Sequence, residues 1–288
     1  MSRLGRISHA VMLEHTLFSL PLAVSALLLE SGGSPARGKV LWILAAVFGA
    51  RNGANALNRL IDREIDAANP RTADRDLPSG RVSSRELVIF TALCGLLLLI
   101  AAWQLNPLCL ALTPVAALLI GGYSFTKRFT WLCHYWLGLT CSAAVMGAFL
   151  ALAGRFELRF FPLTAGTALW IAGFDIIYAL QDLEHDRKEG LHSIPARFGR
   201  RGALVLSALS HLGALFCWGL TAYFYPLRFW FFLGLGGAAL LLGAEHILAR
   251  RGTRIPLAAY KLNQILSPLL TAFIILDIYL PGGLHGTV

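Results

Sequence analysis

The chain has 288 residues, of which 56% are apolar and only 14% are charged, and its formal net charge is +9. This composition excludes an ordinary soluble domain, in which about a quarter of the residues are charged, and it predicts a polytopic membrane protein. The basic excess could suggest a nucleic-acid partner, but its distribution along the chain favours a role in membrane orientation and no binding of nucleic acid.

Nine apolar stretches approach the length of about 20 residues that a helix needs to cross a bilayer. They are residues 10–30, 40–61, 87–104, 107–124, 132–153, 161–181, 203–224, 228–248 and 263–281. The first stretch carries Glu14 and His15 and lacks a small-residue cleavage site, so it predicts a retained helix rather than a signal peptide. We therefore expect an all-α integral membrane protein with about nine transmembrane helices in a single domain, 1–288.

The second stretch ends in a polar series at four-residue spacing, Asn58, Asp62 and Asp66. On a helix, side chains four residues apart share one face and lie about 5–6 Å from each other. Two turns further inside, Arg51 lies on the same face as Asn58. A buried arginine needs an anionic partner, and two partners are open: an intramembrane pair with Asp175, or the carboxylate of a bound substrate.

The sixth stretch ends in the same way, with Tyr178, Asp182 and Asp186. Either motif alone could be a solvated helix end, but two at equal depth favour a shared functional site. Close carboxylates repel one another, so we expect a cation between them. Mg²⁺ fits, because one or two carboxylates typically hold it while it bridges to phosphate oxygens. The constant offset between the motifs also suggests that the halves, 1–155 and 156–288, are distant duplicates.

Basic residues accompany both motifs. Each alone could simply orient the protein, but together they suit a diphosphate, with arginine providing forked contacts. We expect the diphosphate to be bound by Arg71, Arg75, Lys127 and Arg128.

The remaining basic residues indicate which way the protein faces. With the N-terminus in the cytoplasm and nine helices, eighteen lysines and arginines fall on the cytoplasmic side and five on the other. This asymmetry follows the positive-inside rule. Both motifs, and the long loops 63–86 and 181–202 that follow them, would then be cytoplasmic. We expect a bacterial inner-membrane protein with its active-site loops in the cytoplasm.

The motifs resemble those of the UbiA superfamily of membrane aromatic prenyltransferases, in particular its 4-hydroxybenzoate polyprenyltransferase-like branch, which includes futalosine-pathway menaquinone enzymes. The resemblance rests on the two acidic motifs and on further segments that run through most of the chain. These are Arg71, Arg75 with Leu77-Pro78-Ser79-Gly80, the run Tyr123 to Arg128, and Gly190 with Ser193-Ile194-Pro195. One departure is Arg59, which stands where the family usually has Asp as the second residue of the first motif.

The resemblance implies helices arranged in a ring, two Mg²⁺ ions, and a polyprenyl diphosphate whose tail emerges into membrane lipid. The acceptor would be an aromatic carboxylic acid, either 4-hydroxybenzoate or 1,4-dihydroxy-6-naphthoate, for ubiquinone or menaquinone biosynthesis. Asp62, Asp66, Asp182 and Asp186 would be catalytic and, with Asn58, would hold the metal. Arg51, Asp175 and Tyr178 would bind the acceptor, and Phe174 and Tyr178 would shelter the allylic cation.

Two alternatives remain at this point. A transporter of cations or organic anions also uses intramembrane charges, although such sites favour the bilayer midplane and broken helices. A haem- or chlorophyll-type prenyltransferase is the second, although Arg51 suits a compact acid better than a macrocycle. Scattered histidines without ligand spacing are interpreted as packing residues: His15, His134, His211 and His246.

Overall fold

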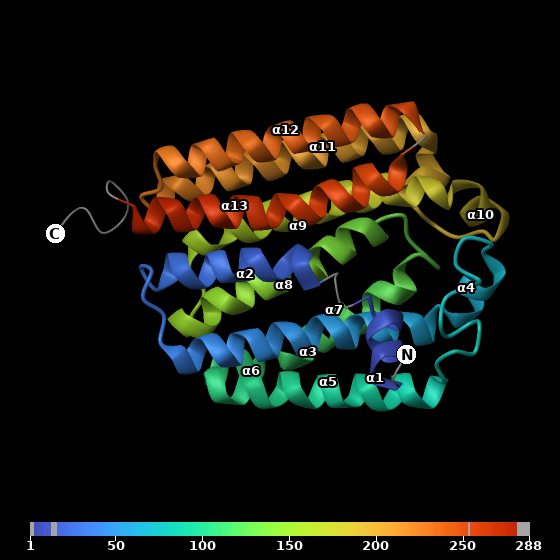
Figure 1. Ribbon diagram of the computed structural model, residues 1–288, viewed down its shortest axis with the longest axis horizontal. Helices are drawn as coiled ribbons and strands as arrows, with labels where there is room; N and C mark the ends of the chain where they lie inside the picture. Colours follow the sequence, from blue (N-terminus) through green and yellow to red (C-terminus); the bar gives the residue numbers. More distant parts are fainter. Residues whose placement is uncertain (1–2, 13–15, 253, 281–288) are drawn as a thin grey trace.

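The computed structural model describes residues 3–12, 16–252 and 254–280, and these residues form helices and turns with no strand among them (Figure 1). Glu14 and His15 lie outside the described residues. In chain order the helices are α1 (Arg3–Ala10), α2 (Thr16–Glu30), α3 (Arg37–Ile61), α4 (Arg63–Ala68), α5 (Ser84–Leu105), α6 (Pro107–Ala111), α7 (Thr113–Thr126), α8 (Cys133–Ala153), α9 (Phe161–Tyr178), α10 (Leu183–Lys188), α11 (Ile194–Phe224), α12 (Phe229–Arg251) and α13 (Leu262–Tyr279). Short turns of other helix types, η2 (Leu158–Phe160), η3 (Ala179–Gln181) and η4 (Leu257–Lys261), extend α9 and α13.

Seven helical segments of the described chain are long and apolar enough to cross a membrane, and two shorter apolar helices, Phe18–Glu30 and Thr113–Thr126, accompany them. Together they occupy the nine predicted stretches. The prediction of an all-α membrane protein is therefore confirmed, with nine as an approximate count of helices.

Some boundaries differ from the prediction. The seventh apolar stretch was expected to begin at residue 203, but α11 already begins at Ile194. The Ser193 side chain accepts a hydrogen bond from the Ala196 amide and caps this earlier start. Gly199, with φ of 67°, then kinks the helix. Apolar content marks only the part of a helix that lies in lipid, so the polar first turns of α11 escape a hydropathy criterion.

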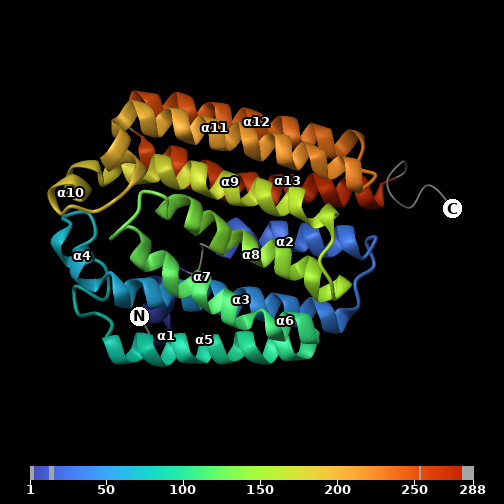
Figure 2. The same cartoon turned by 180° about the vertical axis from the view of Figure 1, so that it is seen from behind.

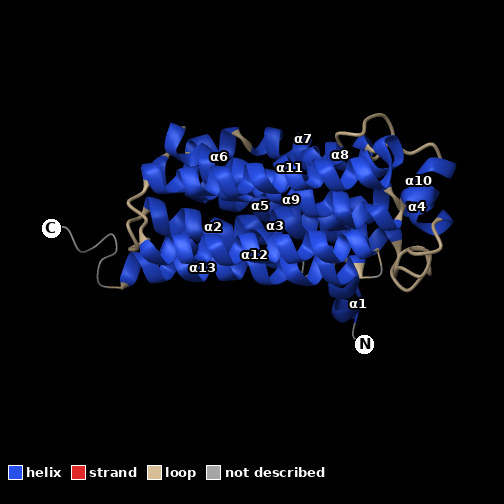
Figure 3. Cartoon of the chain, turned by 90° about the horizontal axis from the view of Figure 1, so that it is seen from above, coloured by secondary structure: helices blue, strands red, loops and turns tan. Residues whose placement is uncertain are grey.

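The spanning helices close into a ring. Contacts run between neighbours in chain order, including α3 with α5, α8 with α9, α9 with α11, and α12 with α13, and α13 returns to pack against α2. At one end of the bundle, α4 and α10 lie side by side beyond the spanning helices, and α1 lies nearer this end than the other, beside α3 and α5 (Figures 1 and 2). The view from above shows the loops around α4 and α10 gathered there, while α13 ends at the opposite end (Figure 3).

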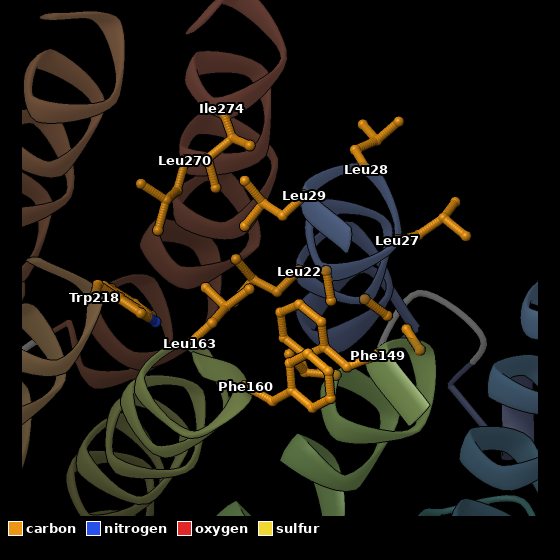
Figure 4. Close-up of a cluster of buried hydrophobic side chains, with 14 of the residues drawn as sticks. Leu22, Leu27, Leu28, Leu29, Phe149, Phe160, Leu163, Trp218, Leu270 and Ile274 are labelled. Atoms are coloured by element: carbon orange, nitrogen blue, oxygen red, sulfur yellow. The ribbon is translucent and has the colours of Figure 1, made fainter. Parts of the chain in front are cut away.

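The largest buried cluster joins α2, α8, α9, α11 and α13 (Figure 4). Phe149 of α8 stacks on Phe160 at a centroid distance of 4.6 Å, and Leu22, Trp218 and Leu270 belong to the same cluster. Lipid tails are as apolar as these side chains, so close van der Waals packing, rather than exclusion of water, holds such helices together.

Packing is tightest where α8 meets α9. A Cβ atom added at Gly138 of α8 would overlap the backbone carbonyl of Ala168 in α9. Only a residue without a side chain allows this approach, which is the usual role of small residues between membrane helices. The contact fixes the separation of two helices that both carry polar residues toward the α4/α10 end.

Candidate active site

Both acidic motifs bend at their central aspartate. Asp62 follows the last residue of α3 with φ −91° and ψ 9°, and Asp182 follows the η3 turn with φ −102° and ψ 2°. A six-residue helix then carries the last aspartate of each motif, α4 for Asp66 and α10 for Asp186. The expectation of one continuous helix face was therefore wrong, because the backbone leaves the helical region at the middle residue.

The loop that follows α4 joins the two motifs. Arg71 donates to both oxygens of Asp182, from Nε at 2.8 Å and from Nη2 at 2.6 Å. Asn69 donates to the same carboxylate at 2.8 Å. Arg71 also donates to the Tyr178 hydroxyl at 3.2 Å, with its guanidinium 5.3 Å from the ring centroid. The structure thus brings residues of the first motif's loop onto the second motif.

The carboxylate of Asp62 is only 4% exposed and is surrounded by donors. Asn58 Nδ2 donates to it at 2.7 Å, and Lys127 Nζ lies 3.2 Å away. Arg128 lies 3.2 Å from the other oxygen and also donates to the Ile61 carbonyl at 3.0 Å. Arg128 therefore stabilises the C-terminal end of α3 and also contacts the Asp62 carboxylate.

Asp66, in the first motif, has its own pair of cations. Arg75 donates to Asp66 Oδ1 at 2.7 Å, and Arg59 lies 3.5 Å from Oδ2. Arg59 is thus a second cation beside the motif, at the position where the family usually has an acid. We expected a metal because close carboxylates repel one another. In this structure, arginine and lysine side chains neutralise that charge.

The two aspartates of the second motif differ in their electrostatics. Burial alone would raise the pKa of Asp182, but the contacts with Arg71 and Asn69 outweigh it and hold that pKa below its ordinary value. Burial raises the pKa of Asp186, which the hydrogen bond from the Ser193 hydroxyl at 2.7 Å only partly offsets. Asp182 is therefore the more firmly ionised of the two.

The donor set fits a hard divalent cation. Asp62 Oδ1 and Asp66 Oδ2 are buried and lack an aligned hydrogen-bond donor, although Arg128 and Arg59 lie near them. Carboxylate oxygens are the ligands that Mg²⁺ prefers. Within the described chain, no three acidic, histidine or cysteine side chains converge on one point as a ready-made metal site. The present ion pairs would have to open for a metal to bind.

Arg51 lies apart from these ion pairs, at an apolar cavity of about 310 Å³ between α3, α5, α7 and α8. It is the one charged side chain among the described residues that line the cavity, whose walls include Val47, Leu98 and Met146. Arg51 Nη1 lies 2.8 Å from Cys141 Sγ. The predicted depth of Arg51, inside the membrane part of α3, agrees with this position.

Asp175 has a hydrogen-bond partner that the sequence analysis did not assign. His134 Nδ1 lies 2.7 Å from Asp175 Oδ2. His134 was interpreted as a packing residue, and the proposed pair of Asp175 with Arg51 stays a prediction. The sequence did offer one indication: His134 lies near the start of its apolar stretch, at the membrane face where the second motif is expected. Nothing in the sequence, however, places α8 beside α9.

The profile described as the UbiA prenyltransferase family matches residues 19–265. The chain belongs to this family. Among curated relatives, 4-hydroxybenzoate octaprenyltransferase of Tolumonas auensis is 31% identical over 83% of each chain. The same-named protein of Aeromonas salmonicida is 30% identical over 92% of each.

Solved structures of UbiA homologues share the fold. The apo structure of a UbiA homologue from Aeropyrum pernix K1 is 33% identical, has a TM-score of 0.85, and matches 92% of this chain and 98% of its own. A UbiA homologue from Archaeoglobus fulgidus bound to DMAPP and Mg²⁺ is 18% identical, with a TM-score of 0.70 and 93% and 97% covered. The chain is therefore an integral membrane prenyltransferase of the UbiA type.

Proposed function

We propose that this UbiA-type enzyme transfers a polyprenyl group from its diphosphate to a ring carbon of an aromatic carboxylic acid, with 4-hydroxybenzoate as the first candidate. The observation that carries the proposal is the position of Arg51, the one charged residue among the described residues that line an apolar cavity. Such a site suits a mostly apolar ligand with one anionic group, and arginine binds carboxylates in a planar, forked geometry. The names of the curated relatives support the same acceptor.

At the α4/α10 end, the basic residues would grip the diphosphate. Arg71, Arg75 and Lys127 each contact a motif carboxylate now, and charge-assisted contacts of the same kind can form to phosphate oxygens. Mg²⁺, the ion found with DMAPP in the Archaeoglobus fulgidus homologue, would supply charge that neutralises the departing diphosphate. The residues that would hold it are Asn58, Asp62, Asp66, Asp182 and Asp186.

Aromatic side chains of α2, α9 and η4 pack together in and around the core. Phe174 of α9 packs against Phe18 at 5.2 Å and against Trp170 at 5.4 Å, and Tyr260 meets Phe18 at 5.5 Å. Ring faces attract cations, so this row would shelter the allylic cation as its bond to diphosphate breaks. The apolar walls of the cavity beside Arg51 would keep water out.

The membrane arrangement is also a proposal. The basic residues around α4 and α10 favour the cytoplasmic side for this end of the bundle. The curated relatives are bacterial proteins, which supports an inner-membrane location. The polyprenyl substrate would then enter from the lipid, and the acid and Mg²⁺ from the cytoplasm.

The test uses the purified full chain in nanodiscs with Mg²⁺ and octaprenyl diphosphate. The acceptors 4-hydroxybenzoate and 1,4-dihydroxy-6-naphthoate are offered separately, with benzoate as the control that lacks a hydroxyl group. Prenylated 4-hydroxybenzoate that forms with Mg²⁺ and disappears with excess EDTA supports the proposal. Product from the naphthoate alone would reassign the acceptor, and no product from either acid would contradict the proposal, as a transporter would predict.

A further inference from the structure

We propose that Asp175, oriented by His134, accepts the proton that the aromatic ring loses after the prenyl group has been attached. The inference rests on the proposed function and goes beyond it by naming the base. Among the described carboxylates, Asp76 also pairs with an imidazole, that of His9, but Arg81 engages it as well. Asp62, Asp66 and Asp182 are each engaged by arginine or lysine. Those three are already assigned to the metal and the diphosphate.

The geometry fixes the histidine in one orientation. His134 Nδ1 lies 2.7 Å from Asp175 Oδ2, and His134 Nε2 accepts a hydrogen bond from the Ile194 amide at 3.4 Å. Because Nε2 accepts, the ring proton of a neutral imidazole lies on Nδ1 and is donated to Asp175. This arrangement, a base oriented by a third group, is common to acid–base sites.

The two partners differ in accessibility. The His134 side chain is 5% exposed, whereas the Asp175 side chain is 25% exposed. One oxygen of Asp175 is thus held by the buried imidazole, and the carboxylate still has open surface for a ligand. His134 is a positioning residue in this scheme, and Asp175 is the catalytic one.

The depth of Asp175 suits an acceptor bound by Arg51. At 1.5 Å rise per residue, Asp175 lies about 4.5 Å along α9 from Tyr178, and Arg51 lies about 10 Å along α3 from Asn58. Asp175 is therefore closer along its helix to the second motif than Arg51 is to the first. Arg51 contacts Cys141 in α8, the helix that also carries His134, the partner of Asp175.

The step balances as an electrophilic aromatic substitution. A ring carbon next to the hydroxyl group forms a bond to C1 of the prenyl chain, while the bond from C1 to the diphosphate oxygen breaks. The C–H bond at that ring carbon then breaks, its electron pair restores the aromatic ring, and the proton passes to Asp175. The products are the prenylated acid, free diphosphate and a neutral Asp175, which later releases its proton to water. General base catalysis of this kind typically contributes about 10²–10⁴-fold.

The experiment compares wild type with Asp175→Asn, which keeps the shape and removes the base. Turnover is measured with 4-hydroxybenzoate and with the same acid deuterated at both ring carbons beside the hydroxyl group. For wild type we expect nearly equal rates. For Asp175→Asn we expect a fall of about 10²–10⁴-fold and a rate ratio between the two acids clearly above one, because breaking the C–H bond becomes limiting. His134→Gln should show the same isotope effect with a smaller fall.

Thr164→Val in α9 is the matched control, since among the described residues its hydroxyl donates to the Phe160 carbonyl one turn earlier, at 2.8 Å, and to no motif residue. It should keep the wild-type rate and show no isotope effect. If Asp175→Asn loses activity without an isotope effect, or keeps wild-type turnover, Asp175 is not the base. If Asp175→Asn does not fold, the ratio of the rates with the unlabelled and the deuterated acid is measured on His134→Gln instead, and a ratio of one contradicts the proposal. Failure of wild type to make any product would instead contradict the proposed function.

Discussion

Arg71 and Asp182 form a two-pronged ion pair, with Nε 2.8 Å from Oδ1 and Nη2 2.6 Å from Oδ2, that joins the loop of the first motif to the second. The arginine is predicted to bind the diphosphate and the aspartate to bind the metal. Without those ligands, the two groups satisfy each other. Ligand binding would therefore be an exchange. The Arg71 guanidinium would leave the Asp182 carboxylate and bind a phosphate oxygen, and the metal would bind the carboxylate instead.

This exchange predicts that Arg71 opposes metal binding in the absence of diphosphate. Arg71→Gln should tighten Mn²⁺ binding to the otherwise ligand-free protein, because Asp182 loses its competing cation. A charge-assisted hydrogen bond is worth about 1.5–3 kcal/mol, so the dissociation constant should fall by roughly ten- to a hundredfold. Calorimetry with Mn²⁺ alone, and again with pyrophosphate, measures both affinities. Unchanged or weaker Mn²⁺ binding by the variant would contradict the exchange.

The two central aspartates should be essential for turnover. Asp62→Ala and Asp182→Ala each remove a carboxylate that would face the metal and the leaving group, and we expect prenyl transfer to fall by at least about 10²–10³-fold. Asp74→Ala is the control, because Asp74 lies in the same loop with a side chain that is 93% exposed. Rates are measured on protein that elutes as a single species in detergent. Near wild-type transfer by either central variant would remove that aspartate from the mechanism.

Lys127 should act on the donor rather than the acceptor. It lies 3.2 Å from Asp62, and its backbone carbonyl accepts from the His192 amide at 2.6 Å. Lys127→Ala should raise the KM for the prenyl diphosphate by roughly ten- to a hundredfold, the equivalent of about 1.5–3 kcal/mol. The KM for the aromatic acid should change little. An increase confined to the acid would move Lys127 to the other subsite.

Arg51 should govern the acceptor. Arg51→Leu should abolish prenylation of 4-hydroxybenzoate while leaving binding of prenyl diphosphate largely intact. Arg51→Lys should rescue poorly, because an ammonium group cannot reproduce a forked contact with a carboxylate. Affinities for the two substrates, measured separately by calorimetry, distinguish the subsites. Efficient prenylation of the acid by Arg51→Leu would make this residue structural.

The loop that carries Arg71 and Arg75 should loosen in acid. Asp76 in this loop is 6% exposed, with hydrogen bonds to Arg81 at 2.7 Å and to His9 at 2.6 Å. Burial alone would raise the pKa of Asp76, but these contacts outweigh it and hold the pKa below its ordinary value. A lowered folded-state pKa gives stability that is present above the unfolded pKa and is lost as the pH falls through the folded one.

Hydrogen exchange of residues 69–82 measures this effect. Wild-type protection, relative to Asp76→Asn, should be constant near neutral pH and should shrink as the pH falls below about 4, the ordinary range of an aspartate. Below the folded-state pKa the two proteins should exchange alike. A difference that grows in acid would show that the contacts of Asp76 do not stabilise the loop.

Much of this architecture could be predicted from the sequence, because bilayer-spanning helices must be apolar over a fixed length. The repeated spacing around Asp62 and Asp182 likewise predicted that the two motifs share a site. The bend at each aspartate could not be predicted, since a four-residue spacing fits a continuous helix equally well and carries no information on φ and ψ at its middle residue. The pair of His134 with Asp175 was missed because it exists only where α8 lies against α9.

The close approach at Gly138 has a consequence for that pair. Gly138 lies one turn from His134 along α8, and its backbone rests against Ala168 in α9. Even a single methyl group at this position would act as a wedge between the helices and draw the imidazole away from Asp175. Gly138 has no side chain, yet it would control the distance between His134 and Asp175. A substitution that adds one carbon atom at Gly138, outside the site, would therefore alter the chemistry within it.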